Sequence, residues 1–279
     1  MTEKSTKFVY LPGAGGGGEG DLAAMAAGLD LPVGFEPIRY PGWQRSMAEG
    51  FSAETLLEEL TAEIEKKVPS GPIRIMGMSI GGHLGYAAAL RLQAKGREIA
   101  GLCVVDSFMI ETSKPTSGWQ GRALAEGMDL LRKRRFMDLA RFARSKAWRA
   151  LLRLGGKPLL KMLGRASASG GMNSLLAADA VAERELSMRL LIGHLAPWLV
   201  ELDHEPVPLS APVALLRTRV SARDDVAWMR RCPCVTIYEV PGTHQTLFEA
   251  ENLAEMRKAF GAAAAEFNRS SAALLETSA

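Results

Sequence analysis

Short apolar runs alternate with amphipathic stretches over the first 107 residues of the chain. The runs are rich in β-branched residues and predict strands, while the alanine- and leucine-rich stretches between them predict helices. This β-α-β-α-β-α-β order predicts an α/β protein with a mostly parallel, doubly wound sheet. The expected strands are residues 7–11, 35–39, 73–76 and 99–105, and the expected helices are residues 21–29, 52–68 and 81–95.

The alternation stops over residues 108–206, where no segment has a convincing strand pattern. A basic amphipathic run from Asp129 to Leu154 is followed by the helix-breaking sequence Gly155-Gly156-Lys157-Pro158. We therefore expect a helical lid insertion at 108–206, over the carboxyl edge of the sheet. Residues 1–107 and 207–279 would form the core.

The strand pattern returns after the insertion. Residues 212–217 and 234–240 predict two more strands, with a short helix at 222–231 between them. A last helix carries apolar residues at helical spacing, which is typical of a face that packs on a core. Those residues are Leu253, Met256, Phe260, Ala263 and Phe267.

A serine lies where the third strand meets its helix, in the sequence Gly77-Met78-Ser79-Ile80-Gly81. G-x-S-x-G on a strand–turn–helix is typical of the nucleophile elbow of α/β-hydrolases. Such an elbow presents the serine hydroxyl to a base on one side and to a substrate on the other. The N–H of Ile80, at the start of the helix, would point to where an oxyanion forms.

The first strand ends in a glycine-rich loop, Pro12-Gly13-Ala14-Gly15-Gly16-Gly17-Gly18. Glycines this dense permit positive φ and a close approach of the backbone to a ligand. We interpret the loop as the second half of an oxyanion hole, with the N–H of Ala14 facing that of Ile80. A phosphate-binding loop is disfavoured, because no Gly-Lys-Ser/Thr sequence follows.

A nucleophilic serine needs a histidine base, and the base needs an acid to orient it. Only His244 follows a strand at the same edge of the sheet. Two places could supply the acid, Asp106 after one strand or Asp224 and Asp225 after another. Both give the chain order Ser…Asp…His, and the pattern alone does not choose between them.

Composition and charge limit the classes of partner that this chain could bind. The 279 residues are 47% hydrophobic with no 18-residue apolar run, so we expect no stable membrane span. Between Ser107 and Gly170 there are 14 Lys and Arg against 4 Asp and Glu, a balance of +10, so the net charge of +3 leaves −7 elsewhere. Few aromatic residues and an acidic remainder argue against nucleic acid. Three cysteines and a polar N-terminus favour a reducing, cytoplasmic location and no metal site.

Several segments resemble the thioesterase domains of polyketide synthase and non-ribosomal peptide synthetase systems. Leu11–Gly16 resembles the first-strand oxyanion motif of that family, Tyr40-Pro41-Gly42 its next landmark, and Gly77–Gly82 its elbow. Cys103–Ser107 and Val240–His244 resemble its later strand ends, although Thr243 stands where the family more often has an acidic residue. The resemblance covers roughly residues 7–107 and 210–267, and hardly the insertion.

The resemblance implies an α/β-hydrolase fold and a Ser79–Asp106–His244 triad, because Asp106-Ser107 resembles the aspartate–serine strand end of that family, whose aspartate is the triad acid. It implies a hydrolase that releases acyl, polyketide or peptidyl chains from a carrier-protein thioester, by hydrolysis or cyclisation. The expected partners are an acyl or peptidyl carrier protein and an acyl thioester. The thioesterase itself needs no cofactor, and phosphopantetheine on the carrier would hold the substrate.

Two alternatives stay open. A small-molecule carboxylesterase or lactonase could use the same fold and triad. A non-catalytic protein could bind partners through the insertion.

Overall fold

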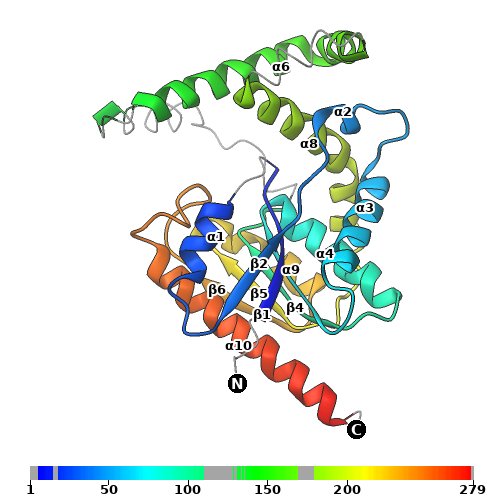
Figure 1. Cartoon of the computed structure of the whole chain (residues 1–279), viewed down its shortest axis with the longest axis vertical. Coiled ribbons are helices and arrows are strands. Elements are labelled where there is room, and N and C mark those ends of the chain that lie inside the picture. The colour runs from blue at the N-terminus through cyan, green and yellow to red at the C-terminus, as the bar shows by residue number, and fades with distance from the viewer. Residues whose placement is uncertain are drawn as a thin grey trace. The chain divides into compact units, whose positions relative to one another are not determined.

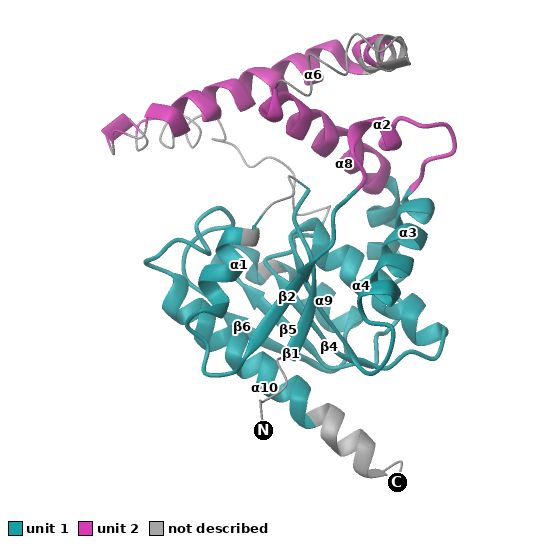
Figure 2. Cartoon of the chain, in the orientation of Figure 1, with its two compact units in different colours: residues 1–40, 53–112, 197–279 teal, residues 41–52, 113–196 magenta. Residues whose placement is uncertain are grey.

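The structure of the chain is a computed structural model, and it describes residues 6–14, 18–109, 128, 131–132, 134, 136–168 and 179–277 (Figure 1). The chain divides into two compact units (Figure 2). Unit 1 comprises residues 1–40, 53–112 and 197–279, and unit 2 comprises residues 41–52 and 113–196. The assignment of residues 108–206 as a lid domain stays a prediction.

Unit 1 is built on a six-stranded sheet in which all neighbouring strands are parallel, in the order β2-β1-β3-β4-β5-β6. The chain passes from β1 to β2 at one edge of the sheet, and then adds β3, β4, β5 and β6 in turn on the other side of β1. This is the doubly wound arrangement that the alternating pattern predicts. The strands are β1 (Thr6–Leu11), β2 (Val33–Pro37), β3 (Ile73–Met78), β4 (Ile99–Val105), β5 (Val213–Arg217) and β6 (Val235–Glu239).

Helices cover both faces of this sheet (Figure 1), and its inner strands β1, β3, β4 and β5 are therefore mostly buried. One face packs against α1 (Glu19–Ala26) and α10 (Leu253–Thr277), where Phe8 lies 5.0 Å from Phe260 between ring centroids. The other face packs against α4 (Ile80–Ala94), which in turn packs against α3 (Ala53–Lys67).

Two further elements lie at the carboxyl edge of the sheet. After β5 the chain forms a 3₁₀ turn, η1 (Arg219–Asp224), and the short helix α9 (Asp225–Arg231). Trp228 of α9 is buried and stacks on His83 of α4. The elements that follow β4, β5 and β3 therefore meet at this edge, as expected for a parallel sheet.

All the regular secondary structure in the described part of unit 2 is helical. It contains α2 (Trp43–Ser46), α6 (Phe136–Ala168) and most of α8 (Ala180–His204). The predicted break in α6 is present: Gly156 has φ 48° and Pro158 lies inside the helix. A small core of its own holds the unit together, built from Trp43, Leu152, Leu163, Ala182, Leu186 and Leu190.

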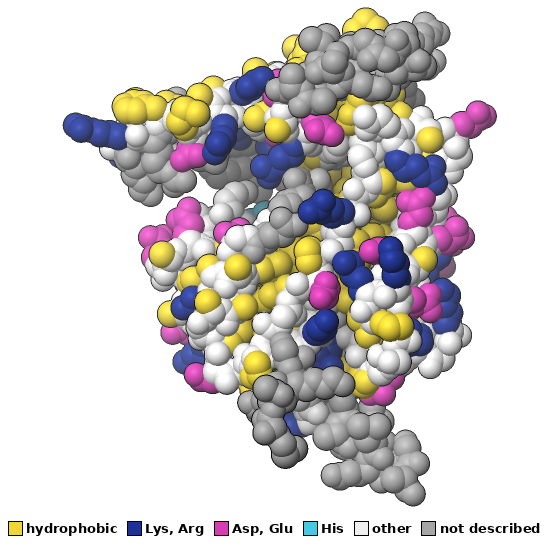
Figure 3. Space-filling model, in the orientation of Figure 1, with side chains coloured by type: hydrophobic (Ala, Val, Ile, Leu, Met, Phe, Trp, Pro, Cys, Tyr) yellow, Lys and Arg dark blue, Asp and Glu magenta, His cyan; other side chains and the backbone are white. Residues whose placement is uncertain are grey.

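Arginines of α6 contribute to this unit through ion pairs. Arg149 donates to the buried carboxylate of Glu185 on α8, with N–O distances of 2.7 and 3.0 Å. Arg144 pairs with Asp179 at 2.6 Å. On the face shown in Figure 3, hydrophobic and basic side chains lie next to one another over α6. Arg144 and Arg149 therefore join the helices of unit 2, while Arg141 of α6 is exposed.

Within the described ranges, no helix is long and apolar enough to cross a membrane. The same residues contain no cluster of three or more His, Cys, Asp or Glu side chains arranged to hold a metal ion. Cys103, Cys232 and Cys234 are free thiols.

Candidate active site

Ser79 occupies the turn between β3 and α4 with φ 56° and ψ −122°. A non-glycine residue is strained in this region, and the strain persists only where neighbours hold the turn. The neighbours here have no room for side chains. A Cβ on Gly77 would lie 2.5 Å from the carbonyl carbon of Gly81, and one on Gly81 would lie 2.6 Å from the oxygen of Pro12. The two glycines therefore permit the sharp elbow that the G-x-S-x-G spacing predicts.

The loop after β1 lies directly beside the elbow. A Cβ built on Gly13 would be 3.6 Å from the Cβ of Ser79, so the backbone of the loop passes close to the elbow. The hydroxyl of Tyr40 donates a hydrogen bond of 2.6 Å to the carbonyl oxygen of Pro12 and fixes the start of the loop. Ala14 follows on this loop, and Ile80 is the first residue of α4. Their roles as oxyanion donors stay a prediction, and residues 15–17 of the glycine run lie outside the described residues.

Asp106 follows β4 directly and is fully buried. Its Oδ2 lies 2.8 Å from Nδ1 of His244. Its Oδ1 accepts three hydrogen bonds: from the backbone N–H of Thr218 at 2.9 Å, from the Thr218 hydroxyl at 2.9 Å and from the Ser221 hydroxyl at 2.5 Å. Burial on its own would raise the pKa of Asp106, but the hydrogen bonds from His244, Ser221 and Thr218 outweigh it and hold the pKa below its usual value.

The other two candidate acids point elsewhere. Asp224 accepts a hydrogen bond from the backbone N–H of Met109 at 3.2 Å. Asp225 pairs with Arg217, at 3.1 Å from its Nε. Of the three aspartates that the pattern left open, Asp106 is the one in contact with His244.

His244 lies on the loop that follows β6, shortly after Gly242, whose φ is 87°. Because an ionised carboxylate only accepts, Nδ1 of His244 carries the proton, and Nε2 of the neutral ring has a free lone pair. The ring of Phe108 packs against the imidazole, with ring centroids 5.3 Å apart. Ser79 and His244 make no direct hydrogen bond in the described part of the chain. Such bonds are often long before substrate binds.

The remaining histidines lie in other settings. His83 is buried in α4, where both ring nitrogens have partners. His194, in unit 2, bonds through Nε2 to the carbonyl oxygen of Ser46 at 2.8 Å. His204 is the last residue of α8. Of the four, His244 is the histidine in contact with Asp106.

The sequence does not predict the contacts of four residues that matter here: Thr218, Ser221, His83 and Tyr40, the last of which appears in it only as part of the Tyr40-Pro41-Gly42 landmark. Thr218 follows β5 immediately, so its place at a strand end could have indicated a partner for Asp106. Ser221 and His83 carry no comparable signal, because their contacts depend on how η1 and α4 pack.

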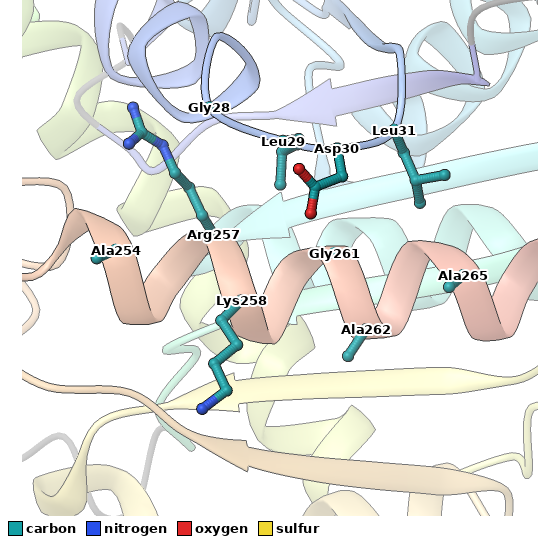
Figure 4. Close-up of a pocket in the computed structure, with 10 residues that line it drawn as sticks. All are labelled: Gly28, Leu29, Asp30, Leu31, Ala254, Arg257, Lys258, Gly261, Ala262 and Ala265. Carbon is teal, nitrogen blue, oxygen red and sulfur yellow. The ribbon is translucent and has the colours of Figure 1, made fainter.

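A hollow of about 600 Å³ lies elsewhere in unit 1, between the segment after α1 and helix α10 (Figure 4). It is lined by Gly28–Leu31 and by one side of α10, with Arg257 and Lys258 at its edge. Ser79, Asp106 and His244 do not line it, so this hollow is separate from the candidate active site.

Comparison with known proteins identifies the family. A family model described as "Thioesterase domain" matches residues 6–154, more than half of the chain. The chain is 26% identical over 244 residues to "Inactive atromentin synthetase invA3" of Paxillus involutus, covering 82% of this chain and 24% of that protein. It is 27% identical over 124 residues to "Enterobactin synthase component F" of Escherichia coli (strain K12), covering 44% of this chain and 9% of that protein. The chain thus spans a quarter or less of the length of these curated relatives.

Solved thioesterase domains share the fold. The NocB thioesterase domain, in a covalent complex with a fluorophosphonate nocardicin G analog, has a TM-score of 0.58 at 19% identity over 94% of this chain and 95% of that chain. The Vlm2 thioesterase domain, bound with a dodecadepsipeptide, has a TM-score of 0.57 at 20% identity over 92% and 95%. These likenesses confirm the α/β-hydrolase fold. With the family model, they confirm the expected resemblance, and the chain belongs to the thioesterase domain family.

Proposed function

We propose that this chain is a serine thioesterase that releases an acyl, polyketide or peptidyl chain from a carrier-protein thioester through an acyl-enzyme on Ser79. The observation that carries the proposal is the 2.8 Å contact between Asp106 and His244 at the strand ends beside the Ser79 elbow. The relatives support the substrate class, because they are named as a synthetase and a synthase. In a four-domain nonribosomal peptide synthetase, a part amounting to 19% of its chain shares the fold, with a TM-score of 0.56 over 92% of this chain at 18% identity.

In the first half-reaction, Nε2 of His244 takes the proton of the Ser79 hydroxyl while Oγ attacks the thioester carbonyl. The backbone N–H groups of Ala14 and Ile80 hold the oxyanion of the tetrahedral intermediate. When the C–S bond breaks, the imidazolium returns the proton to the departing thiolate. Asp106 keeps the ring in the required tautomer and stabilises the imidazolium.

In the second half-reaction, water or a nucleophile within the acyl chain loses its proton to His244 and attacks the acyl-enzyme. The ester bond to Ser79 breaks, and Oγ regains its proton. A thiol with a pKa of roughly 8.5 is a better leaving group than an alkoxide, which favours thioesters over oxoesters as substrates. On the carrier, the thiol would belong to phosphopantetheine.

We further propose that residues 108–206 act as a lid and a docking surface for an acidic carrier protein. The segment begins two residues after Asp106 and ends shortly before β5. Thr218, which bonds to Asp106, directly follows β5. Its first part has the excess of +10 described above. Arg144 and Arg149 serve unit 2 itself, so the exposed Arg132 and Arg134 are better candidates for docking.

The experiment that tests this function incubates the enzyme with a panel of acyl thioesters on an acyl carrier protein and identifies the products by mass spectrometry. Matched oxoesters of the same acyl groups serve as controls. Faster release from thioesters, lost in Ser79→Ala, is the expected result. Preference for oxoesters would indicate a carboxylesterase or lactonase, and no turnover of either series would indicate a binding protein.

A further inference from the structure

His83 is a buried histidine that the proposed mechanism does not use. It lies in the first turns of α4, four residues after Ser79, and its exposed fraction is 2%. Nη1 of Arg231 lies 2.8 Å from its Nδ1, and its Nε2 lies 2.9 Å from the carbonyl oxygen of Phe108. Because a guanidinium only donates, Nδ1 must accept, and Nε2 must carry the hydrogen that is donated to Phe108. The two partners together specify a single neutral tautomer.

Arg231 is as deeply buried as His83, and it has several partners of its own. Its exposed fraction is 1%, and its guanidinium forms an ion pair with Asp203 near the end of α8. The same group lies over the rings of Trp228 and Tyr86, 5.2 and 5.4 Å from their centroids. Burial and the charge of Arg231 lower the pKa of His83 to about 3. Together they outweigh the hydrogen bond to Phe108, which on its own would raise this pKa. The ring thus stays neutral across the working range of an enzyme.

The carbonyl that His83 holds belongs to the segment that supports the candidate site. Asp106 has φ 45°, a strained conformation for a non-glycine residue that needs support from its surroundings. The backbone that follows is held by side chains from separate elements. Nε1 of Trp228 donates to the carbonyl oxygen of Ser107 at 3.0 Å, and Asp224 accepts from the N–H of Met109. His83 provides the link at Phe108, whose ring packs on His244.

We propose that His83 and Arg231 are positioning residues for His244. They hold the Phe108 carbonyl, and through it they place the Phe108 ring against the imidazole, while Asp106 holds Nδ1 of that imidazole. The inference rests on the proposed function, because it requires His244 to be the base. A displaced Phe108 would let the imidazole tilt away from Ser79, and misplacement by about 1 Å can lower a rate by about 100-fold.

The test compares His83→Leu, which removes both hydrogen bonds, with His83→Gln, whose amide can accept from Arg231 and donate to Phe108. Two readouts are used: the rate at which a fluorophosphonate modifies Ser79, followed against pH by mass spectrometry, and hydrolysis of a short acyl N-acetylcysteamine thioester. His83→Leu should lower the labelling rate and kcat by about 10- to 100-fold with little change in KM, and shift the midpoint of the pH–rate profile. His83→Gln should stay within about threefold of wild type.

Phe108→Ala keeps the backbone carbonyl and removes the ring, so it tests the contact between Phe108 and His244 even if His83→Leu folds poorly. It should reproduce the kinetic loss, and adding His83→Leu to it should bring little further loss. Arg231→Met should resemble His83→Leu, whereas Arg230→Met, at the exposed neighbouring position, should not.

A folded His83→Leu or Phe108→Ala enzyme with the wild-type pH profile and kcat would overturn the inference. So would equal losses in the Leu and Gln variants, since a merely structural role would not distinguish them. Ser79→Ala separates this result from a failure of the proposed function. If Ser79→Ala is inactive while His83→Leu behaves as wild type, only the positioning role is wrong; if Ser79→Ala is fully active, the proposed function itself is wrong.

Discussion

Asp106 and His244 meet across the carboxyl edge of the sheet, with Oδ2 of the carboxylate 2.8 Å from Nδ1 of the imidazole. The two residues are 138 positions apart in the chain, and the second oxygen of Asp106 is fully occupied by Thr218 and Ser221. The carboxylate therefore cannot rotate without losing three hydrogen bonds. This rigidity suits a group whose task is to fix the orientation of another side chain.

The first prediction concerns the acid. Asp106→Asn should lower kcat by about 10³-fold or more, because an amide in this place favours the wrong tautomer of His244. Asp225→Asn is the matched control: it removes the charge of one of the two carboxylates that pair with Arg217, and it should leave kcat near wild type. Steady-state kinetics of the two purified variants would decide. An impaired Asp225→Asn beside an active Asp106→Asn would show that the wrong aspartate has been assigned.

The second prediction concerns the loop beside the elbow. Tyr40→Phe removes the 2.6 Å hydrogen bond to the carbonyl oxygen of Pro12, and the loop that carries Ala14 loses an anchor. A single hydrogen bond of this kind contributes about 1 kcal/mol, so kcat should fall by about threefold to tenfold with KM little changed. Tyr10→Phe is the control, since the hydroxyl of Tyr10 has only the sulfur of Met78 at 3.9 Å as its described partner. Equal kinetics for wild type and Tyr40→Phe would mean that the hydrogen bond from Tyr40 to Pro12 does not position Ala14 for oxyanion binding.

The third prediction concerns the pH dependence of stability. The pKa of His83 is about 3 in the folded chain against about 6.5 for an unfolded histidine, so below pH 6 the unfolded chain binds the extra proton. The stability due to the neutral ring is therefore fully present above pH 6.5 and lost as the pH falls toward 3. Its loss should approach about 1.4 kcal/mol per pH unit in this window.

Urea unfolding of wild type and His83→Gln between pH 7 and pH 4 measures this effect as a difference between the two proteins. The variant should show the shallower decline with falling pH. Parallel declines would mean that His83 is not held neutral by its surroundings.

The sequence could predict the outline of this fold because its signals are local. Glycines at Gly77 and Gly81 mark the elbow through steric limits that act within a few residues, and the apolar strands alternate with amphipathic helices. The parallel, doubly wound sheet and the α/β-hydrolase class follow from that alternation together with the family resemblance. Neither needs any knowledge of how particular side chains meet.

The supporting contacts could not be predicted in the same way. Ser221 reaches Asp106 across 115 positions of sequence, and Arg231 reaches His83 across 148. A serine in a 3₁₀ turn and an arginine at the end of a short helix have ordinary local patterns. Their roles arise only when α4, α9 and η1 pack at one edge of the sheet. The sequence pattern also did not choose Asp106 over Asp224 and Asp225, and that choice needed the family resemblance.

The fourth prediction concerns docking of a carrier protein. Reversal of Arg132, Lys133, Arg134 and Arg135 to glutamate should raise KM for a carrier-bound thioester and spare a short N-acetylcysteamine thioester; Lys133 and Arg135 lie outside the described residues. Carrier-protein turnover should also fall with salt, because the Debye length shrinks from about 10 Å at 0.1 M to about 3 Å at 1 M. If both substrates respond equally, the basic run has no part in recognition, and the catalytic proposal is unaffected.

The central claim is that Ser79 is the nucleophile. Its most direct test is treatment of the native chain with a fluorophosphonate, followed by peptide mass spectrometry to locate the modified residue, with Ser79→Ala assayed in parallel. We expect stoichiometric modification of Ser79 and a loss of at least about 10³-fold in kcat for the variant. Stoichiometric labelling of a different serine, together with full activity of Ser79→Ala, would contradict the account.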